Sequence, residues 1–244
     1  MNLSFYKYQG TGNDFVIIDN RELNFPKENH ELVRRLCDRR FGIGADGLML
    51  LEVAVGYDFK MVYFNSDGHP STMCGNGGRC LVAFAKKIGL VTDKAFFLAT
   101  DGPHSAFFNE NDVCLGMSDV LEVSKRNEAF FLDTGSPHHV QFVTDIASLD
   151  VKKEGAKIRY GLYGAKGANV NFISEQSDVV KIRTYERGVE DETLSCGTGV
   201  TAVAVSIYEQ QPDQTLPIPI QTLGGQLKVN FTKRDRAYTD IILQ

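Results

Sequence analysis

A cysteine-glycine phrase that occurs twice constrains this chain more than any other feature of its sequence. Residues 74–77 read Cys-Gly-Asn-Gly and residues 196–199 read Cys-Gly-Thr-Gly. Cys74 and Cys196 are 122 residues apart, half the length of the 244-residue chain. An apolar stretch with helical spacing follows each copy, so we expect each cysteine to lie where a helix begins. Two copies at matching places predict two similar halves, each contributing one thiol to a shared site.

A helix start would suit such a thiol for electrostatic reasons. The first N–H groups of a helix lack acceptors within it and form the positive end of its dipole. They attract anions and lower the pKa of a nearby thiol, and glycine lets a ligand approach the backbone closely. Cysteine caps helices poorly compared with Ser, Thr, Asp or Asn. A purely structural role therefore explains two such cysteines poorly.

Composition places the chain among ordinary globular proteins. A hydrophobic content of 43% can fill the core of one large domain or of two domains of about 120 residues. The net charge of −5 argues against a nucleic-acid or anionic membrane surface, and no apolar run approaches the roughly 20 residues of a membrane span. Five cysteines, an odd number, argue against a disulfide framework. We therefore expect a cytoplasmic protein with a small-molecule or protein partner.

Hydrophobic patterning predicts a mixture of strands and helices in both halves. One helix is expected from Pro26 to Cys37, and another from Cys74 to about Ile88, ending at Gly89. A boundary between the halves is expected near residues 118–126. Alternating or β-branched runs predict strands at residues 3–8, 15–18, 48–53, 59–64, 95–99, 104–108, 112–117, 129–133, 140–143, 170–174, 179–185, 227–231 and 238–243.

Polar residues near the predicted strand ends are further candidates. Asn13 lies in a turn where an asparagine most simply caps its own backbone. Asn65 precedes Cys74 by nine residues and Glu186 precedes Cys196 by ten, so the halves match in position as well as in composition. The adjacent histidines after Pro137 can bind a ligand or order a loop. Neither CxxC nor HxxxH spacing occurs, so we expect no metal site and no redox dithiol.

Seven motifs are spread over nearly the whole chain: residues 10–15, 42–47, 64–68, 74–80, 169–172, 186–188 and 192–199. Together they resemble the diaminopimelate epimerase family. The sequence departs from the family pattern in two places. Ser136 stands where the family commonly has an asparagine before Pro-His, and the segment from Glu186 to Cys196 is one residue longer than usual. Both departures affect substrate binding more than the thiol chemistry.

The resemblance implies an isomerase that interconverts LL- and meso-2,6-diaminopimelate in lysine and cell-wall precursor biosynthesis. Cys74 and Cys196 would exchange protons with the α-carbon from opposite faces, without pyridoxal phosphate, any other cofactor or a metal. The implied fold is α/β, with α+β-type mixed sheets in two pseudo-symmetric domains, each a curved sheet wrapped around a central helix. Residues 1–118 and 119–236 would form the domains, and residues 237–244 a terminal strand that can return to the first. The family also suggests a homodimer.

The resemblance further implies roles in substrate binding. An acidic side chain would hold the substrate α-ammonium, a guanidinium and amides would hold the distal end, and N–H groups at the helix starts would receive the carbanion's charge. These residues are Asn13, Asn65, Gly75, Asn76, Ser136, His138, Asn169, Glu186, Arg187, Gly197 and Thr198.

Three alternatives remain open on the sequence. A proline or hydroxyproline racemase-like enzyme also uses two cysteines, although Glu186, Arg187 and the turn at residues 10–15 favour a substrate with a charged distal end. A phenazine-pathway isomerase of related fold would lack the thiol pair. A non-catalytic amino acid binding protein or a thiol sensor could use the same fold.

Overall fold

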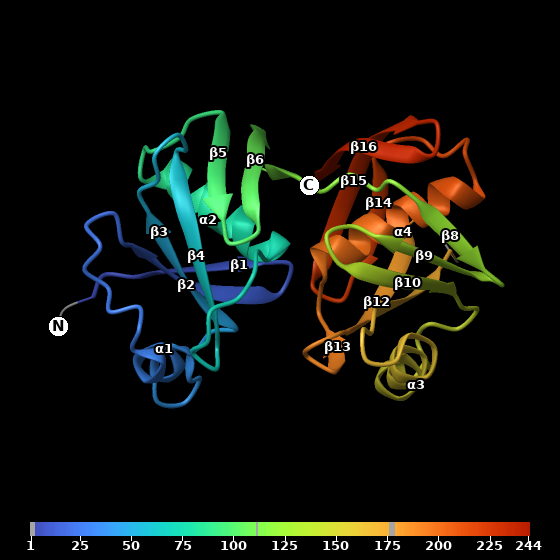
Figure 1. The fold of residues 1–244 in the computed structure, drawn as a ribbon, viewed down its shortest axis with the longest axis horizontal. Helices are drawn as coiled ribbons and strands as arrows, with labels where there is room; N and C mark the ends of the chain where they lie inside the picture. The colour runs from blue at the N-terminus through green and yellow to red at the C-terminus, as the bar shows by residue number, and fades with distance from the viewer. Residues whose placement is uncertain (1–2, 111, 176–178) are drawn as a thin grey trace. The chain divides into compact units, whose positions relative to one another are not determined.

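The computed structural model describes residues 3–110, 112–175 and 179–244. The chain divides into two compact units, Met1–Leu115 and Gly116–Gln244, close to the predicted boundary after residue 118. Each unit has its own mixed sheet and two helices among the described residues (Figure 1).

The sheet of the first unit has its strands in chain order, β1-β2-β3-β4-β5-β6-β7. β2 and β3 are parallel, as are β4 and β5, and the other neighbours are antiparallel. Helix α1 connects the first parallel pair and helix α2 the second. The elements are β1 (Tyr6–Gly10), β2 (Asn13–Asp19), α1 (His30–Cys37), β3 (Gly47–Glu52), β4 (Phe59–Asn65), α2 (Gly75–Lys87), β5 (Lys94–Ala99), β6 (Gly102–Asn109) and β7 (Asp112–Gly116).

The sheet of the second unit runs β8-β9-β10-β11-β12-β14-β15-β16, and β13 pairs with β12 outside this order. Helices α3 and α4 connect its parallel pairs, β10 with β11 and β12 with β14. The elements are β8 (Val123–Arg126), β9 (Ala129–Asp133), β10 (Pro137–Phe142), α3 (Val151–Tyr163), β11 (Asn169–Ser174), β12 (Val180–Glu186), β13 (Asp191–Thr193), α4 (Gly197–Gln210), β14 (Ile218–Thr222), β15 (Gly225–Arg234) and β16 (Ala237–Leu243).

The two units repeat one topology. From β1 to β7 the successive pairings are antiparallel, parallel, antiparallel, parallel, antiparallel and antiparallel. The same succession runs from β9 to β16 when β13 is set aside. Helix α1 corresponds to α3 and α2 to α4, so the two cysteines precede equivalent helices. The internal repeat expected from the cysteine-glycine phrases is therefore a repeat of structure.

The helix that follows each cysteine is the buried one. α4 contacts strands from β9 to β16, and Val200, Val203 and Ile207 are buried in the core that these strands enclose. α2 packs on β1, β2 and β3, with Leu81 and Phe84 fully buried. In Figure 1 α4 lies among the strands of its unit, whereas α1 and α3 lie outside the sheets. The predicted mixed α/β class with a central helix in each half is confirmed.

The structure differs from the predicted elements in several places. α1 begins at His30 rather than near Pro26, because the Asn29 side chain caps it by accepting a hydrogen bond from Leu32 N at 3.0 Å. The sequence reasoning missed α3, β8, β13 and β14. The terminal strand β16 pairs with β15 in the second unit, and its return to the first unit stays a prediction. No helix in the described part of the chain is long and apolar enough to cross a membrane.

Candidate active site

Cys74 and Cys196 have the same local geometry, and both are helix N-caps as predicted. Cys74 has φ −110° and ψ 122°, and Cys196 has φ −126° and ψ 111°. The first helical hydrogen bonds run from Gly78 N to Cys74 O at 2.7 Å and from Val200 N to Cys196 O at 2.9 Å. The three N–H groups before each of these donors have no acceptor within the helix. Each thiol therefore lies at an anion-attracting helix start.

The second glycine of each phrase lies against the sheet of its own unit. A Cβ added at Gly77 would lie 1.7 Å from Met49 Cε, and one at Gly199 would lie 2.6 Å from Asn171 Oδ1. Any larger residue would push the helix start away from the strands. Gly77 and Gly199 are thus needed for packing, a role that the sequence argument set aside in favour of the approach of a ligand.

In the first unit, Asn13 and Asn76 meet in front of the start of α2. Asn76 Nδ2 donates to Asn13 Oδ1 at 3.3 Å, and Asn13 Nδ2 donates to Asp46 Oδ2 at 2.6 Å. Asn65 ends β4 opposite Gly47, which in turn pairs with Phe15 of β2. The strand register therefore brings Asn13, at the start of β2, and Asn65, at the end of β4, to the same end of the sheet, although they are far apart in sequence.

A salt-bridge network holds the residues that contact Asn13. Arg39 bonds Asp14 at 2.7 Å and Asp46 at 2.8 Å, and Lys7 bonds Asp14 at 2.7 Å. Burial opposes ionisation of Asp14, but the hydrogen bonds from Arg39 and Lys7 hold its pKa below the ordinary value. Because Arg39 bonds Asp46 as well as Asp14, the Asp46 carboxylate is held where it accepts the hydrogen bond from the Asn13 amide. Sequence reasoning saw the motif at residues 42–47 but not this role of Asp46.

In the second unit, a hydrogen-bond chain joins His138 to Cys196. His138 Nε2 lies 2.9 Å from Thr198 Oγ1, which lies 3.3 Å from Cys196 Sγ. His138 is fully buried, and burial, followed by the charge of Arg187, lowers its pKa to about 3. The imidazole is therefore neutral at physiological pH.

The neighbours of His138 determine which of its nitrogens carries the proton. Asn171 Nδ2 donates to His139 O at 3.1 Å, and Asn171 Oδ1 accepts from Thr184 Oγ1 at 3.0 Å, so its amide orientation is fixed. The same Nδ2 lies 3.0 Å from His138 Nδ1, which must accept. The proton is then on Nε2, which donates to Thr198 Oγ1 and leaves that hydroxyl free to donate to the Cys196 sulfur. Such a donor favours the thiolate.

Other predicted residues of the second unit lie beside the hydrogen-bond chain that joins His138 to Cys196. Ser136 Oγ lies 3.0 Å from His138 Nε2 and accepts from Asn169 Nδ2 at 3.1 Å. Asn169 Oδ1 accepts from the backbone of Arg187 at 2.8 Å. Glu186 ends β12, and burial raises the pKa of its carboxyl above the ordinary value. The guanidinium of the exposed Arg187 donates to Lys166 O at 3.0 Å.

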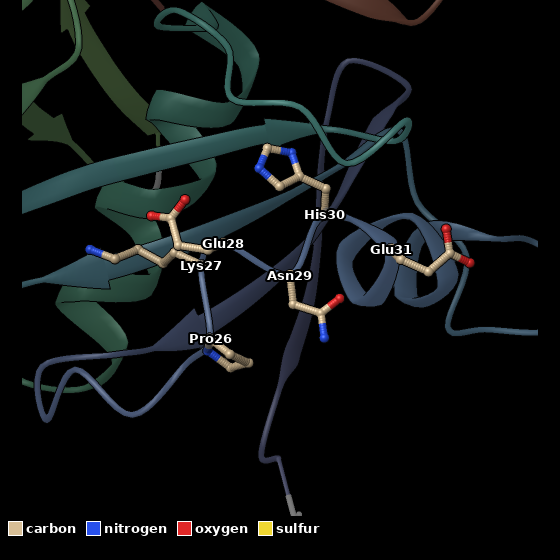
Figure 2. A pocket seen from close by; sticks show the side chains of 6 residues that line it. All are labelled: Pro26, Lys27, Glu28, Asn29, His30 and Glu31. Carbon is tan, nitrogen blue, oxygen red and sulfur yellow. The ribbon is translucent and has the colours of Figure 1, made fainter.

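A depression at the start of α1 does not include any of these residues. It is open to solvent and lies along one short segment (Figure 2). The side chains around it point in different directions in Figure 2, and Lys27 already pairs with Glu52 at 3.0 Å. Its lining residues are Pro26, Lys27, Glu28, Asn29, His30 and Glu31. This surface lacks the convergent polar groups of a binding site.

Within the described residues, no group of three or more His, Cys, Asp or Glu side chains is arranged to hold a metal ion.

The structure places the candidate residues in two groups, one around the start of α2 and one around the start of α4.

The fold is shared with solved proteins of low sequence identity. A phenazine biosynthesis protein of the PhzF family from Bacillus anthracis matches with a TM-score of 0.75 at 15% identity, over 100% of this chain and 95% of that one. A probable proline racemase from Agrobacterium radiobacter matches with a TM-score of 0.69 at 13% identity, over 99% of this chain and 89% of that one. These likenesses define the class of fold, two mixed sheets that each carry a central helix.

Sequence comparison then gives the family. The diaminopimelate epimerase model matches residues 5–106 and 130–241. The diaminopimelate epimerase of Flavobacterium psychrophilum is 56% identical over 245 aligned residues, which cover 99% of this chain and 96% of that protein. The chain belongs to the diaminopimelate epimerase family. This result confirms the resemblance found in the motifs.

The burial of His138 predicts how it responds to pH. The unfolded chain binds a proton at His138 as the pH falls through 6.5, whereas the folded chain does so only near 3. The stability that the neutral imidazole contributes is therefore fully present above pH 6.5 and is lost as the pH falls from 6.5 toward 3. In an NMR titration, the His138 resonance, assigned by its absence in His138→Gln, should show no protonation above about pH 5. A midpoint near the ordinary histidine pKa would contradict the assignment of a neutral Nε2–H tautomer.

The contact of Gly199 with Asn171 predicts a large effect of one methyl group. Gly199→Ala should lower the free energy of unfolding by about 1–3 kcal/mol, because the added carbon lies 2.6 Å from the Asn171 amide oxygen. Gly161→Ala in α3 is the matched control, since its Cβ would meet nothing within 4 Å. That change should leave stability equal or raise it by up to about 1 kcal/mol. Equal urea denaturation curves for the two variants would refute the packing role of Gly199.

Proposed function

We propose that this chain interconverts the LL and meso forms of 2,6-diaminopimelate, a step of lysine biosynthesis, with Cys74 and Cys196 as its acid and base. One observation carries the proposal. The family model matches both halves of the chain, and in each half a cysteine precedes the central helix at an equivalent place. A reaction that used a single thiol would not require this duplication.

The chemistry needs two proton-transfer groups. A proton that is removed and returned on one face of the α-carbon regenerates the same stereoisomer, so inversion needs a base on one face and an acid on the other. In the proposed reaction one thiol is ionised and the other protonated, and the pair reverses these states after each inversion. Neither pyridoxal phosphate nor a metal takes part in this scheme.

The helix starts would stabilise the carbanion. As the proton leaves, negative charge spreads into the α-carboxylate. Backbone N–H groups can stabilise this charge by donating hydrogen bonds to the carboxylate oxygens. Each such donor contributes on the order of 3 kcal/mol to a transition state in a preorganised site. The proposed donors are the N–H groups of Gly75, Asn76, Gly197 and Thr198, none of which has an acceptor within its own helix.

Side chains at the strand ends would give the substrate its orientation. Glu186 is proposed to hold the α-ammonium with Asn13 nearby, because a partly buried carboxylate is stabilised by a bound cation. Arg187 would pair with the distal carboxylate, with Asn65 and Asn169 beside it. Ser136 and His138 would act mainly through Asn169 and Thr198, to which they are hydrogen-bonded.

We also propose that the protein is a cytoplasmic homodimer. The family resemblance supports the dimer, and the net charge of −5 fits a partner that is neither nucleic acid nor an anionic membrane. Light scattering coupled to size exclusion should give about twice the mass of the chain. A monomer at micromolar concentration would refute the dimer without bearing on the catalytic proposal.

The two-base scheme predicts the effect of removing each thiol. Cys74→Ala and Cys196→Ala should each lower epimerisation by about 10³-fold or more, because each removes one proton-transfer group. Cys37→Ala and Cys114→Ala are controls that remove buried thiols on α1 and β7 and should retain turnover. The assay measures deuterium incorporation from solvent at the α-carbon of diaminopimelate, with proline as a second substrate. Near-normal exchange by either active-site variant would refute the scheme, and exchange into proline would favour the racemase-like alternative.

A further inference from the structure

Arg79 places a buried cation near the start of α2. Arg79 is 8% exposed and lies five residues after Cys74. Nη2 donates to Asn76 Oδ1 at 3.1 Å and to Thr11 Oγ1 at 3.3 Å, so the side chain turns back toward the N-terminus of the helix. Nη1 is buried without a hydrogen-bond partner in the described part of the chain. Among the described residues, the hydrogen bonds of the guanidinium therefore go to neutral oxygens.

No carboxylate among the described residues balances this charge. Burying a cation without an anion costs free energy, which usually brings a carboxylate to its side. Asp14 and Asp46 are on adjoining segments, but they pair with Arg39 and Lys7 rather than with Arg79. Among the described residues, the titratable groups electrostatically coupled to Arg79 are the thiols of Cys80 and Cys74.

Of the titratable groups around Arg79, Cys74 is the one suited to ionise. Burial raises the pKa of Cys80 to about 12, so it is a neutral thiol at physiological pH. Tyr8 of β1 faces Cys80, and burial raises its pKa as well. Lys7 is engaged with Asp14 on β2. A guanidinium stays protonated even when burial lowers its pKa, so a full positive charge remains without another anion.

We propose that Arg79 is a positioning residue whose buried positive charge stabilises the thiolate form of Cys74. The inference rests on the proposed function, in which Cys74 exchanges a proton with the substrate. A buried charge is screened less than an exposed one, so it shifts the ionisation of a neighbour more strongly. Arg79 also holds Asn76, whose backbone N–H is a proposed donor to the substrate.

The second helix start lacks this cation. The residue five places after Cys196 is Thr201, a buried hydroxyl that donates to Gly197 O at 3.0 Å. Cys196 has instead the hydrogen-bond chain from His138 through Thr198. The two thiols are therefore stabilised as thiolates by different means, a charge for Cys74 and a hydrogen bond for Cys196.

The experiment measures the ionisation of Cys74 directly. The full-length Cys196→Ala protein is alkylated with iodoacetamide over a range of pH, and each cysteine is followed by peptide mass spectrometry. Arg79→Gln, which keeps a polar side chain but removes the charge, should shift the midpoint for Cys74 upward by about 1 pH unit or more. Arg79→Lys should restore most of the shift, because it retains the charge.

Two controls separate this effect from misfolding. Cys37, Cys80 and Cys114 are buried and should stay unmodified as long as the fold is intact. Arg34→Met removes an exposed arginine of α1 that pairs with Glu31 at 2.6 Å, and it should leave the Cys74 profile unchanged. If Arg79→Gln exposes the buried thiols, Arg79→Lys and Arg79→Met are compared under conditions where those thiols stay protected.

An unchanged Cys74 profile in a folded, uncharged Arg79 variant would overturn the inference. A raised KM for diaminopimelate with an unchanged profile would also overturn it, because Arg79 would then act on the substrate rather than on the thiol. The test needs no turnover, so it can succeed or fail independently of the proposed function. A shifted profile together with normal epimerisation by Cys74→Ala would uphold the electrostatic effect and refute the proposed function.

Discussion

The central crossover helix of each unit, α2 or α4, is the constraint on which the rest of the structure depends. β4 and β5 are parallel, as are β12 and β14, and parallel neighbours require a long connection that is usually a helix. α2 and α4 are these connections, so each begins at the end of the sheet where the preceding strand finishes. Ligands of open α/β sheets bind at the same end. The topology alone therefore places a thiol and the N–H groups of a helix start, which have no acceptor within the helix, near the polar residues that end β4 and β12.

The two helix starts share this geometry but not their surroundings. Cys196 lies beside a neutral hydrogen-bond chain that begins at the buried His138. The start of α2 has a buried guanidinium that no carboxylate in the described part of the chain neutralises. A two-base inversion needs its thiols in opposite protonation states, and a symmetric pair would gain nothing from one state over the other. Unlike surroundings allow two thiols at similar helix starts to ionise differently.

Local sequence patterns predicted the repeated helix starts and most strands, because each depends on residues that are close along the chain. α3 was missed because Gly155 and Gly161 weaken its helical pattern. Gly155 is tolerated there because the Tyr185 ring of β12 packs on it, with Tyr185 Cβ 2.4 Å from the place of an added Cβ. The contact of His138 with Asn171 could not be predicted either. It depends on the register of β10 and β11, which hydrophobic alternation does not specify to the residue.

Ser136 illustrates how a departure from the family pattern can be absorbed. Its hydroxyl accepts from Asn169 Nδ2 and lies against His138 Nε2, while the other end of the Asn169 amide accepts from the backbone of Arg187. The serine thus fixes the amide orientation of Asn169 instead of reaching farther as an asparagine would. Because the same serine also adjoins Thr198 at 3.4 Å, it lies between the proposed substrate-binding group and the hydrogen-bond chain to Cys196. Under the proposed function, a shorter side chain at this position would alter substrate binding through its neighbours and leave the thiol at the helix start in place.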